Sequence, residues 1–284
     1  MSLGKIIVPL DGSERDSISL LTAIRAAKPF KAHIDALFVH PDPAEVWPII
    51  GVPLSAEAMS AVIDGNQQIF REQRARIRDT IEKIATEEGA RTARGPCHGS
   101  GVTVSYQELV GHPPEAIGNA ARLADLTVCA PTESSPRAFE TAIDIVLKNH
   151  RPVLLASQPP SAFRKVVIGW NGSAEAMHAI YAAMPFLEQA DVVQILSVER
   201  ALGPSVTMDP LIVYLRTHGI FPSELHIGKW GTLSDDLLSK LAQEHNADLL
   251  VIGAFSHSRI GETIFGGVTN EMLRHAPLPV LLAH

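Results

Sequence analysis

The sequence predicts an α/β protein of two tandem domains, each an open five-stranded parallel sheet with helices on both faces. Short apolar and β-branched runs alternate with segments of helical periodicity along the whole chain. These runs are nearly continuous, which is typical of strands buried on both faces of a parallel sheet. The pattern occurs twice, so we expect one domain over residues 1–157 and a second over residues 163–284.

The internal duplication is clearest where each half begins and ends. Lys5-Ile-Ile-Val-Pro-Leu-Asp-Gly-Ser13 corresponds to Lys165-Val-Val-Ile-Gly-Trp-Asn-Gly-Ser173. Residues 152–156 and 279–283 share the sequence Pro-Val-Leu-Leu-Ala. A Ser-Gln-Pro-Pro-Ser segment at residues 157–161 is a compact linker between the halves.

In the first half, Ser13-Glu-Arg-Asp16 has the capping-box pattern of a helix start, and Pro113-Pro114-Glu115 places proline in a first helical turn. The strands are expected at residues 5–10, 33–39, 102–109, 126–130 and 153–156. One long helix is expected to carry an apolar face made of Ile63, Phe70, Ile77, Ile81 and Ile84.

The second half repeats this order, with helices expected near residues 209–218 and from residue 232. Its strands are expected at residues 165–170, 192–198, 224–228, 248–252 and 279–283. The first helix is expected to show a stripe of Met177, Ile180, Tyr181, Met184 and Leu187.

Composition excludes several classes of protein. The formal net charge of −7 argues against a nucleic-acid binder, and no apolar run approaches the ~20 residues of a membrane span. The N-terminus lacks an export-signal layout, so we expect a cytoplasmic protein. The two cysteines, Cys97 and Cys129, are too few for a disulfide framework, and the histidines lack metal-ligand spacing.

The segment most suggestive of a ligand is the glycine-rich stretch at residues 253–269, which follows the strand expected at 248–252 and precedes a helix-like segment at 270–275. Glycines let backbone N–H groups approach a ligand closely, and a helix N-terminus favours negative charge. In parallel sheets, ligands bind beyond the carboxyl ends of the strands. The pattern therefore predicts a phosphate-binding loop.

The chain as a whole resembles a tandem universal stress protein. The resemblance rests on the strands that end in Asp11-Gly-Ser and Asn171-Gly-Ser, on the closing His275-Ala-Pro-Leu-Pro-Val-Leu-Leu, and on the glycine-rich loop. It implies an adenine-nucleotide alpha-hydrolase-like fold and a role in the stress response.

Nucleotide-binding members of that family carry the loop pattern G-x2-G-x9-G-[S/T]. Gly253 and Gly266 match its first and third positions, whereas Ser256 and Gly267 replace the second glycine and the Ser/Thr. Thr269 supplies a hydroxyl two residues further on. The resemblance therefore implies a related loop that departs from the family pattern at two of its four positions.

The family's other ligand position is an acidic residue at the end of the first strand. Asn171 stands there in the second half, and Val198 is the candidate for a backbone contact with adenine. ATP with Mg²⁺ is the implied ligand. The implied nucleotide-binding residues are Asn171, Val198, Gly253, Ser256, His257, Ser258, Arg259, Gly266, Gly267, Val268 and Thr269.

The first half keeps Asp11, but residues 131–140 contain no glycine and include Glu133, so we expect no triphosphate site there. Asp-Gly and Asn-Gly are also strong turn formers, which leaves a turn role open for Asp11 and Asn171.

The sequence contains no recognisable pairing of a nucleophile with a general base. We therefore favour regulatory binding of an adenine nucleotide in the C-terminal domain over catalysis. Two alternatives stay open: an interaction protein that has lost nucleotide binding, and a slow ATPase. Residues 153–156 and 280–283 would each be an apolar sheet edge, so we expect them to pair within the chain as an intramolecular pseudo-dimer. Homodimer formation is left open.

Overall fold

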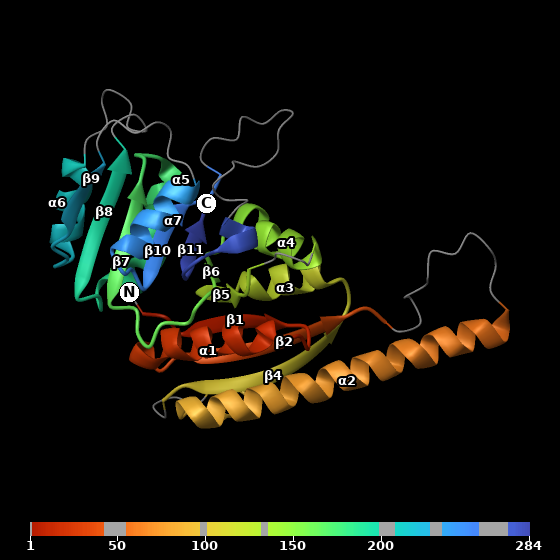
Figure 1. The fold of residues 1–284 in the computed structure, drawn as a ribbon. Coiled ribbons are helices and arrows are strands. Elements are labelled where there is room, and N and C mark those ends of the chain that lie inside the picture. Colours follow the sequence, from red (N-terminus) through yellow and green to blue (C-terminus); the bar gives the residue numbers. More distant parts are fainter. Residues whose placement is uncertain are drawn as a thin grey trace.

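The computed structural model describes residues 2–42, 55–96, 101–131, 136–198, 208–227, 235–255 and 272–284. Its described residues form an α/β fold in which one twisted sheet carries helices on both faces (Figure 1). The predicted fold class is therefore confirmed.

Most of the predicted strands begin and end within a residue or two of the expected positions. The strands are β1 (Lys5–Leu10), β2 (His33–His40), β3 (Arg91–Thr92), β4 (Thr103–Val110), β5 (Leu126–Cys129), β6 (Val153–Leu155), β7 (Lys165–Trp170), β8 (Val192–Val198), β9 (Ser223–Ile227), β10 (Leu249–Gly253) and β11 (Val280–Ala283). The helices are α1 (Arg15–Ala27), α2 (Ala56–Glu88), α3 (Pro113–Ala121), α4 (Pro136–Ile143), α5 (Ala174–Leu187), α6 (Asp209–Thr217) and α7 (Asp235–Glu244), with a 3₁₀ turn at Lys28–Phe30 and a π-helical turn at Asp144–Lys148.

The strands lie in the order β3-β4-β2-β1-β5-β6-β11-β10-β7-β8-β9. The sequence predicted a five-stranded sheet in each half with the last strands of the two halves paired, and the structure has a single continuous sheet of eleven described strands. The extra strand is β3, two exposed residues that pair in parallel with the outer edge of β4. Without β3, the orders β4-β2-β1-β5-β6 and β9-β8-β7-β10-β11 are counterparts of one another.

The two halves of the sheet join through β6 and β11. Leu154 pairs with Leu281 and Val153 with Leu282 in antiparallel register, and all four side chains are buried. The pairing expected from the sequence is therefore present. The other neighbouring strands are parallel, so the strands of the two halves run in opposite directions at this junction and their carboxyl ends lie on opposite edges of the sheet.

A hydrophobic core lies on each face of the sheet. One core combines side chains from α1 and α2 with side chains from α5 and α6, so it is shared by both halves. Phe30 and Phe186 meet within it edge to face, with ring centroids 6.3 Å apart. The second core lies beneath α3 and α4 and includes Ala242 of α7.

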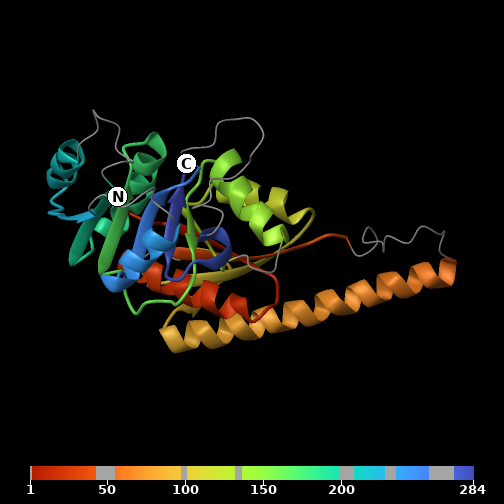
Figure 2. The same cartoon turned by 45° about the horizontal axis from the view of Figure 1, so that its top comes forward.

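Helix α2 is much longer than the sheet it covers, and its N-terminal part extends beyond the body of the protein (Figure 2). Of its predicted apolar face, Ile77, Ile81 and Ile84 are buried, but Ile63 and Phe70 are only partly buried. The predicted stripe on α5 is likewise interrupted at Tyr181, which is 42% exposed. Helical periodicity identified both helices but overestimated how much of each is covered.

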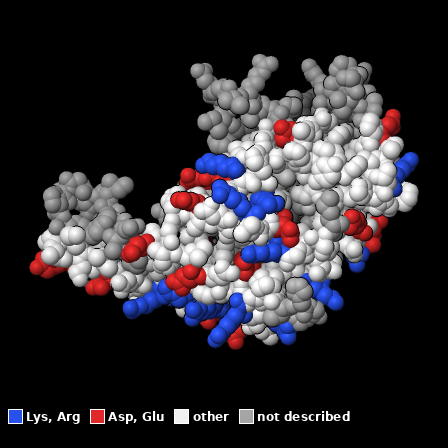
Figure 3. Space-filling view, turned by 180° about the vertical axis from the view of Figure 1, so that it is seen from behind, with Lys and Arg blue, Asp and Glu red and all other residues white. Residues whose placement is uncertain are grey.

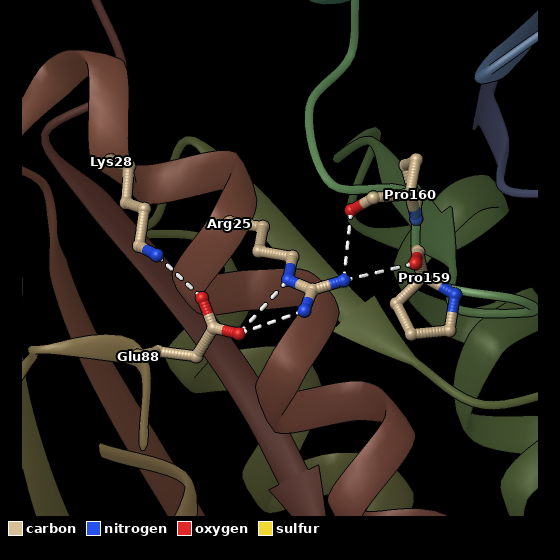
Figure 4. Close-up of polar contacts among 5 residues, drawn as sticks. All are labelled: Arg25, Lys28, Glu88, Pro159 and Pro160. Carbon is tan, nitrogen blue, oxygen red and sulfur yellow. Dashed lines mark hydrogen bonds and ion pairs between the residues drawn. The ribbon is translucent and has the colours of Figure 1, made fainter. Parts of the chain in front are cut away.

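An arginine on α1 connects α2 and the linker between the halves. The Arg25 guanidinium donates to the Glu88 carboxylate, with Nη2 at 2.8 Å, and to the carbonyls of Pro159 and Pro160 at 3.1 and 3.2 Å (Figure 4). Lys28 contacts the other Glu88 oxygen. The Arg25 hydrogen bond lowers the pKa of Glu88.

None of the helices that the structure describes is long and apolar enough to cross a membrane. Lys and Arg side chains are interspersed with Asp and Glu over the described part of the face shown in Figure 3.

Candidate functional site

Three of the sequence-predicted ligand residues are described, and they lie at the carboxyl ends of three neighbouring strands. Gly253 ends β10, Asn171 follows β7 and Val198 ends β8. The strands are hydrogen-bonded in the order β10-β7-β8, so the structure brings these residues to one edge of the sheet.

Asn171 forms a turn at this edge. Its Oδ1 accepts a hydrogen bond from the Ser173 N–H at 3.0 Å, and the Ser173 hydroxyl then accepts from the Ala176 N–H at 3.1 Å. Ser173 is the N-cap of α5. The turn role left open for Asn171 is therefore present, and it sets where α5 begins.

Gly253 lies against the first turn of α5. A Cβ atom at this position would be 2.4 Å from the Ala176 nitrogen and 2.6 Å from the Glu175 carbonyl carbon, both backbone atoms. Only glycine permits this approach without moving the helix. The end of β10 therefore lies directly against the N-terminus of α5, where the helix dipole favours negative charge.

The remaining predicted ligand residues lie outside the described residues. These are Ser256, His257, Ser258, Arg259, Gly266, Gly267, Val268 and Thr269. Cys97, His98 and Glu133 also lie outside them.

The corresponding strand ends of the first half line a cavity of about 320 Å³ that the sequence did not indicate. It opens at the carboxyl ends of β1, β2 and β5 and is bounded by α1, α2, α3 and α4. Most of its wall is apolar, made of Pro9, Leu10, Phe38, Val39, Pro41, Phe70, Pro113, Ile117, Cys129, Ala130, Pro131, Ala138, Ala142 and Ile145. Polar side chains line it around the turn between β1 and α1, and Ser19, His40 and Thr141 add polar groups from α1, β2 and α4.

A buried carboxyl group organises that turn. Asp16 is 4% exposed and accepts hydrogen bonds from the N–H groups of Asp11 at 3.2 Å and Gly12 at 2.8 Å. Burial, with the nearby Asp11 carboxylate, raises the pKa of Asp16 to about 7. The Asp11 carboxylate accepts from the Ser13 N–H at 2.9 Å.

The capping box predicted for Ser13 and Asp16 is not formed. Helix α1 starts at Arg15, and its N-cap, Glu14, makes no side-chain capping hydrogen bond. The Asp16 carboxyl group binds the N–H groups of residues four and five positions earlier, which draws it into the turn and away from a cap. The predicted start of α3 is confirmed, with Pro113 in its first turn.

Two polar atoms beside the cavity are buried without a hydrogen-bond partner among the described residues: the Ser13 hydroxyl and the Gln73 side-chain oxygen. The Gln73 amide nitrogen donates to the Asp11 carbonyl at 2.9 Å, which fixes the amide orientation. Gly12 has φ +81°, and a Cβ there would lie 3.0 Å from Gln73. Helix α2 is thus packed tightly onto the β1–α1 turn.

A second polar group borders the cavity at the end of β2. The His40 ring stacks on Phe70 with centroids 4.6 Å apart, and its two nitrogens contact the Pro41 carbonyl and Glu108. Glu108 also accepts a hydrogen bond from Arg74. This bond has the largest effect among those that lower the pKa of Glu108 to about 2, and the His40 bond adds to it. His40 and Arg74 are therefore engaged with protein partners.

Cys129 belongs to the apolar wall. Burial raises the pKa of its thiol to about 12, so it does not form a thiolate near neutral pH. Among the described residues there is no cluster of three His, Cys, Asp or Glu side chains that could hold a metal ion.

Comparison with known proteins shows a fold shared with solved structures and a family model that matches part of the chain. The structure superposes on a universal stress protein from Archaeoglobus fulgidus DSM 4304 with a TM-score of 0.65 and 14% sequence identity, covering 99% of this chain and 96% of that one. A functionally unknown protein from Pseudomonas aeruginosa PAO1 gives a TM-score of 0.56 at 13% identity, covering 99% and 92% of the two chains. At these identities the likeness establishes the fold alone.

A third structure, titled as a putative universal stress protein from Pseudomonas aeruginosa UCBPP-PA14, gives 0.54 at 14% identity, covering 99% and 93%. The family model for the Universal stress protein family matches residues 215–284, from the end of α6 to the C-terminus. No curated protein matches the chain.

Proposed function

We propose that this chain is a tandem universal stress protein that binds an adenine nucleotide in its C-terminal half and acts by regulated binding. The family match over residues 215–284 supports this, because it includes β10, the glycine-rich segment and β11. The counterpart strand orders of the two halves support a duplicated domain, with boundaries near residues 157 and 163.

The observation that carries the nucleotide proposal is the contact between Gly253 and α5. Because β10 ends against the backbone of Glu175 and Ala176, the glycine-rich segment starts over a helix N-terminus. Backbone N–H groups and the helix dipole at such a position bind phosphate oxygens. We propose that Asn171 and Val198 contact the adenosine end of the nucleotide and that the phosphate ligands come from the glycine-rich sequence at residues 253–269.

A specific contact favours the alternative that nucleotide binding has been lost. The Asn171 Oδ1 is committed to the Ser173 N–H, so that oxygen serves the turn. An uncharged side chain also offers a ribose hydroxyl a weaker acceptor than a carboxylate does. Together with the changed loop positions Ser256 and Gly267, this supports a structural or interaction role as the second candidate.

Calorimetric titration with ATP and Mg²⁺ distinguishes nucleotide binding from a structural or interaction role. We expect saturable heat for the wild-type chain and none for Gly266→Asp, which places a carboxylate among the proposed phosphate donors. Gly65→Ala is the matched control, because a Cβ at Gly65 has no neighbour within 4 Å. Absence of heat and of any thermal shift at millimolar nucleotide would overturn the proposal, and binding gained only by Ser256→Gly with Gly267→Ser would favour the alternative.

A further inference from the structure

The end of β10 is held by the residues at the end of β11. Because β10 and β11 are parallel neighbours, their carboxyl ends lie at one edge of the sheet (Figure 1). The Ala254 N–H donates to the Ala283 carbonyl at 2.8 Å, and the Ala254 carbonyl accepts from Nδ1 of His284 at 2.9 Å. Both backbone polar groups of Ala254 are therefore bound by residues 283 and 284.

The backbone adopts an unusual conformation directly after this contact. Phe255 has φ +64°, a left-handed conformation that residues other than glycine seldom adopt, and its side chain is buried in the second core. Ala254 is fully buried. Such a backbone persists only where the surrounding contacts determine it, and it is common at ligand sites. The His284 hydrogen bond is one of these contacts, at the place where the glycine-rich sequence begins.

A histidine of the first half supports the His284 ring. The imidazole rings of His150 and His284 stack with centroids 6.0 Å apart and an interplanar angle of 17°. His150 precedes β6, and the antiparallel register of β6 with β11 brings it to the carboxyl end of β11. His150 has φ +49°, so it too is held in a left-handed conformation. The first half thus contributes a side chain at the edge of the sheet where the second half has its candidate site.

His284 also lies near the first turn of α5. Burial alone would raise the pKa of Glu175, yet hydrogen bonds from its own N–H and from Ser173 lower it, and the nearby His284 imidazole adds to this effect. The same turn of α5 meets Gly253 at the end of β10. In the first half, Ser157 follows the corresponding Pro-Val-Leu-Leu-Ala sequence, so the histidine belongs to the half that carries the glycine-rich sequence.

We propose that His284 is a positioning residue of the nucleotide site and that His150 makes ligand affinity in the second half depend on the first half. This inference rests on the proposed function of the second half. By donating to Ala254, the His284 ring fixes where the backbone leaves β10 and enters the glycine-rich sequence. A carbonyl oxygen only accepts, so the hydrogen bond requires a proton on Nδ1 and selects that tautomer of the neutral ring. Stacking on His150 keeps the ring from rotating away from the carbonyl.

Two substitutions separate the hydrogen bond of His284 from its ring. His284→Phe keeps a ring and loses the donor, whereas His284→Asn loses the ring and keeps an N–H donor close to the place of Nδ1. We expect His284→Phe to weaken binding of ATP with Mg²⁺ roughly ten- to thirtyfold, because the buried Ala254 carbonyl is left without its donor. His284→Asn should bind within about threefold of the wild type. Equal losses in the two variants, or wild-type affinity in His284→Phe, would overturn the inference.

The dependence on the first half is tested at His150. His150→Asn removes the ring, and asparagine tolerates the left-handed backbone, so the fold is kept. We expect this change to weaken ATP binding about two- to threefold in the wild type and to have no further effect in His284→Asn, where the stacked pair is already absent. His112→Asn is the matched control, because the His112 side chain makes no capping hydrogen bond. Unchanged affinity in His150→Asn, or additive losses in the double variant, would refute the dependence on the first half.

Amide hydrogen exchange tests the role of His284 without nucleotide. The Ala254 amide should exchange about tenfold faster in His284→Phe than in the wild type, and His284→Asn should restore slow exchange. The Val251 amide, in the middle of β10, should exchange alike in all three chains.

The ¹⁵N signals of His284 give a second test, since the neutral ring should carry its proton on Nδ1. A proton on Nε2, or an unchanged Ala254 exchange rate in His284→Phe, would overturn the inference. A wild-type chain that binds no ATP would refute the proposed function and with it the effect on affinity. The exchange rates and the tautomer would then still decide whether His284 positions the end of β10.

Discussion

Substituting Gly253 by alanine directly perturbs the contact between the end of β10 and the first turn of α5. The new methyl group would lie 2.4 Å from the Ala176 nitrogen, 2.6 Å from the Glu175 carbonyl carbon and 2.8 Å from the Ala176 Cα. All three are backbone atoms, so no side-chain rotation relieves the overlap. The first turn of α5 must move away from β10, or β10 must shift in the sheet.

The expected cost follows from overpacking a close-packed interior, about 1–3 kcal/mol. The affected elements are central, because β10 lies between β7 and β11 and its residues Leu249 to Val251 are fully buried. At ~2–4 °C per kcal/mol for a protein of this size, the melting temperature should fall by roughly 2–12 °C.

Urea denaturation followed by circular dichroism measures this cost, with the thermal midpoint as a second readout. Gly65→Ala is the matched control: its methyl group meets nothing within 4 Å in the exposed part of α2, so helix propensity should stabilise it by up to ~1 kcal/mol. A Gly253→Ala protein with the same midpoint and slope as the wild type would refute the argument that backbone crowding demands glycine.

Three further predictions concern polar side chains. The pKa of Asp16 is raised in the folded state from 3.8 to about 7, so the folded protein binds this proton more tightly and should lose roughly 4 kcal/mol of stability as pH rises from about 4 to 7. The Asp16→Asn variant should lack this loss when its urea midpoints at pH 4 and pH 8 are compared. The same dependence of stability on pH in the variant and the wild type would contradict the prediction. Ser173→Ala should lower the free energy of unfolding by about 0.5–2 kcal/mol because it removes the α5 N-cap. Ser13→Ala is the control and should not lower this free energy, because the Ser13 hydroxyl has no hydrogen-bond partner among the described residues. Equal losses for the two variants in urea titrations would count against the cap. Arg25→Ala should lower the free energy of unfolding by about 1–3 kcal/mol because Glu88 and two linker carbonyls lose their hydrogen-bond donor, and Arg25→Lys should restore part of this loss. Proteolysis within residues 157–161 should also be faster in Arg25→Ala. An unchanged cleavage rate would argue that other contacts hold the linker.

The strands were predictable because burial on both faces leaves apolar runs such as Ile6 to Val8 and Leu249 to Val251, which periodicity detects directly. Strand β3 could not be found in this way, because Arg91 and Thr92 are exposed and form a strand only through the edge of β4. The capping box failed for a related reason. A carboxyl group at position 16 can serve several nearby N–H groups, and the local sequence does not determine which.

For the candidate site, the sequence predicted that Asn171 and Gly253 end strands, and the strand order brings them to one edge. It assigned Gly253 to phosphate approach, whereas the structure shows that α5 also requires glycine there. The first-half cavity escaped prediction because its wall combines short pieces of several strands and helices. That the Ser13 hydroxyl and the Gln73 oxygen lack a hydrogen-bond partner in the described part of the chain depends on three-dimensional packing, which no linear pattern encodes.

The pairing of β6 with β11 has a consequence for how the sheet responds to dilution. Two separate half-chains would have to find each other in solution, and the extent of pairing would depend on their concentration. A linker of a few residues holds the second strand at an effective concentration on the order of millimolar. The continuous sheet therefore persists at any protein concentration, and a single cut at residues 157–161 would make its integrity depend on mass action.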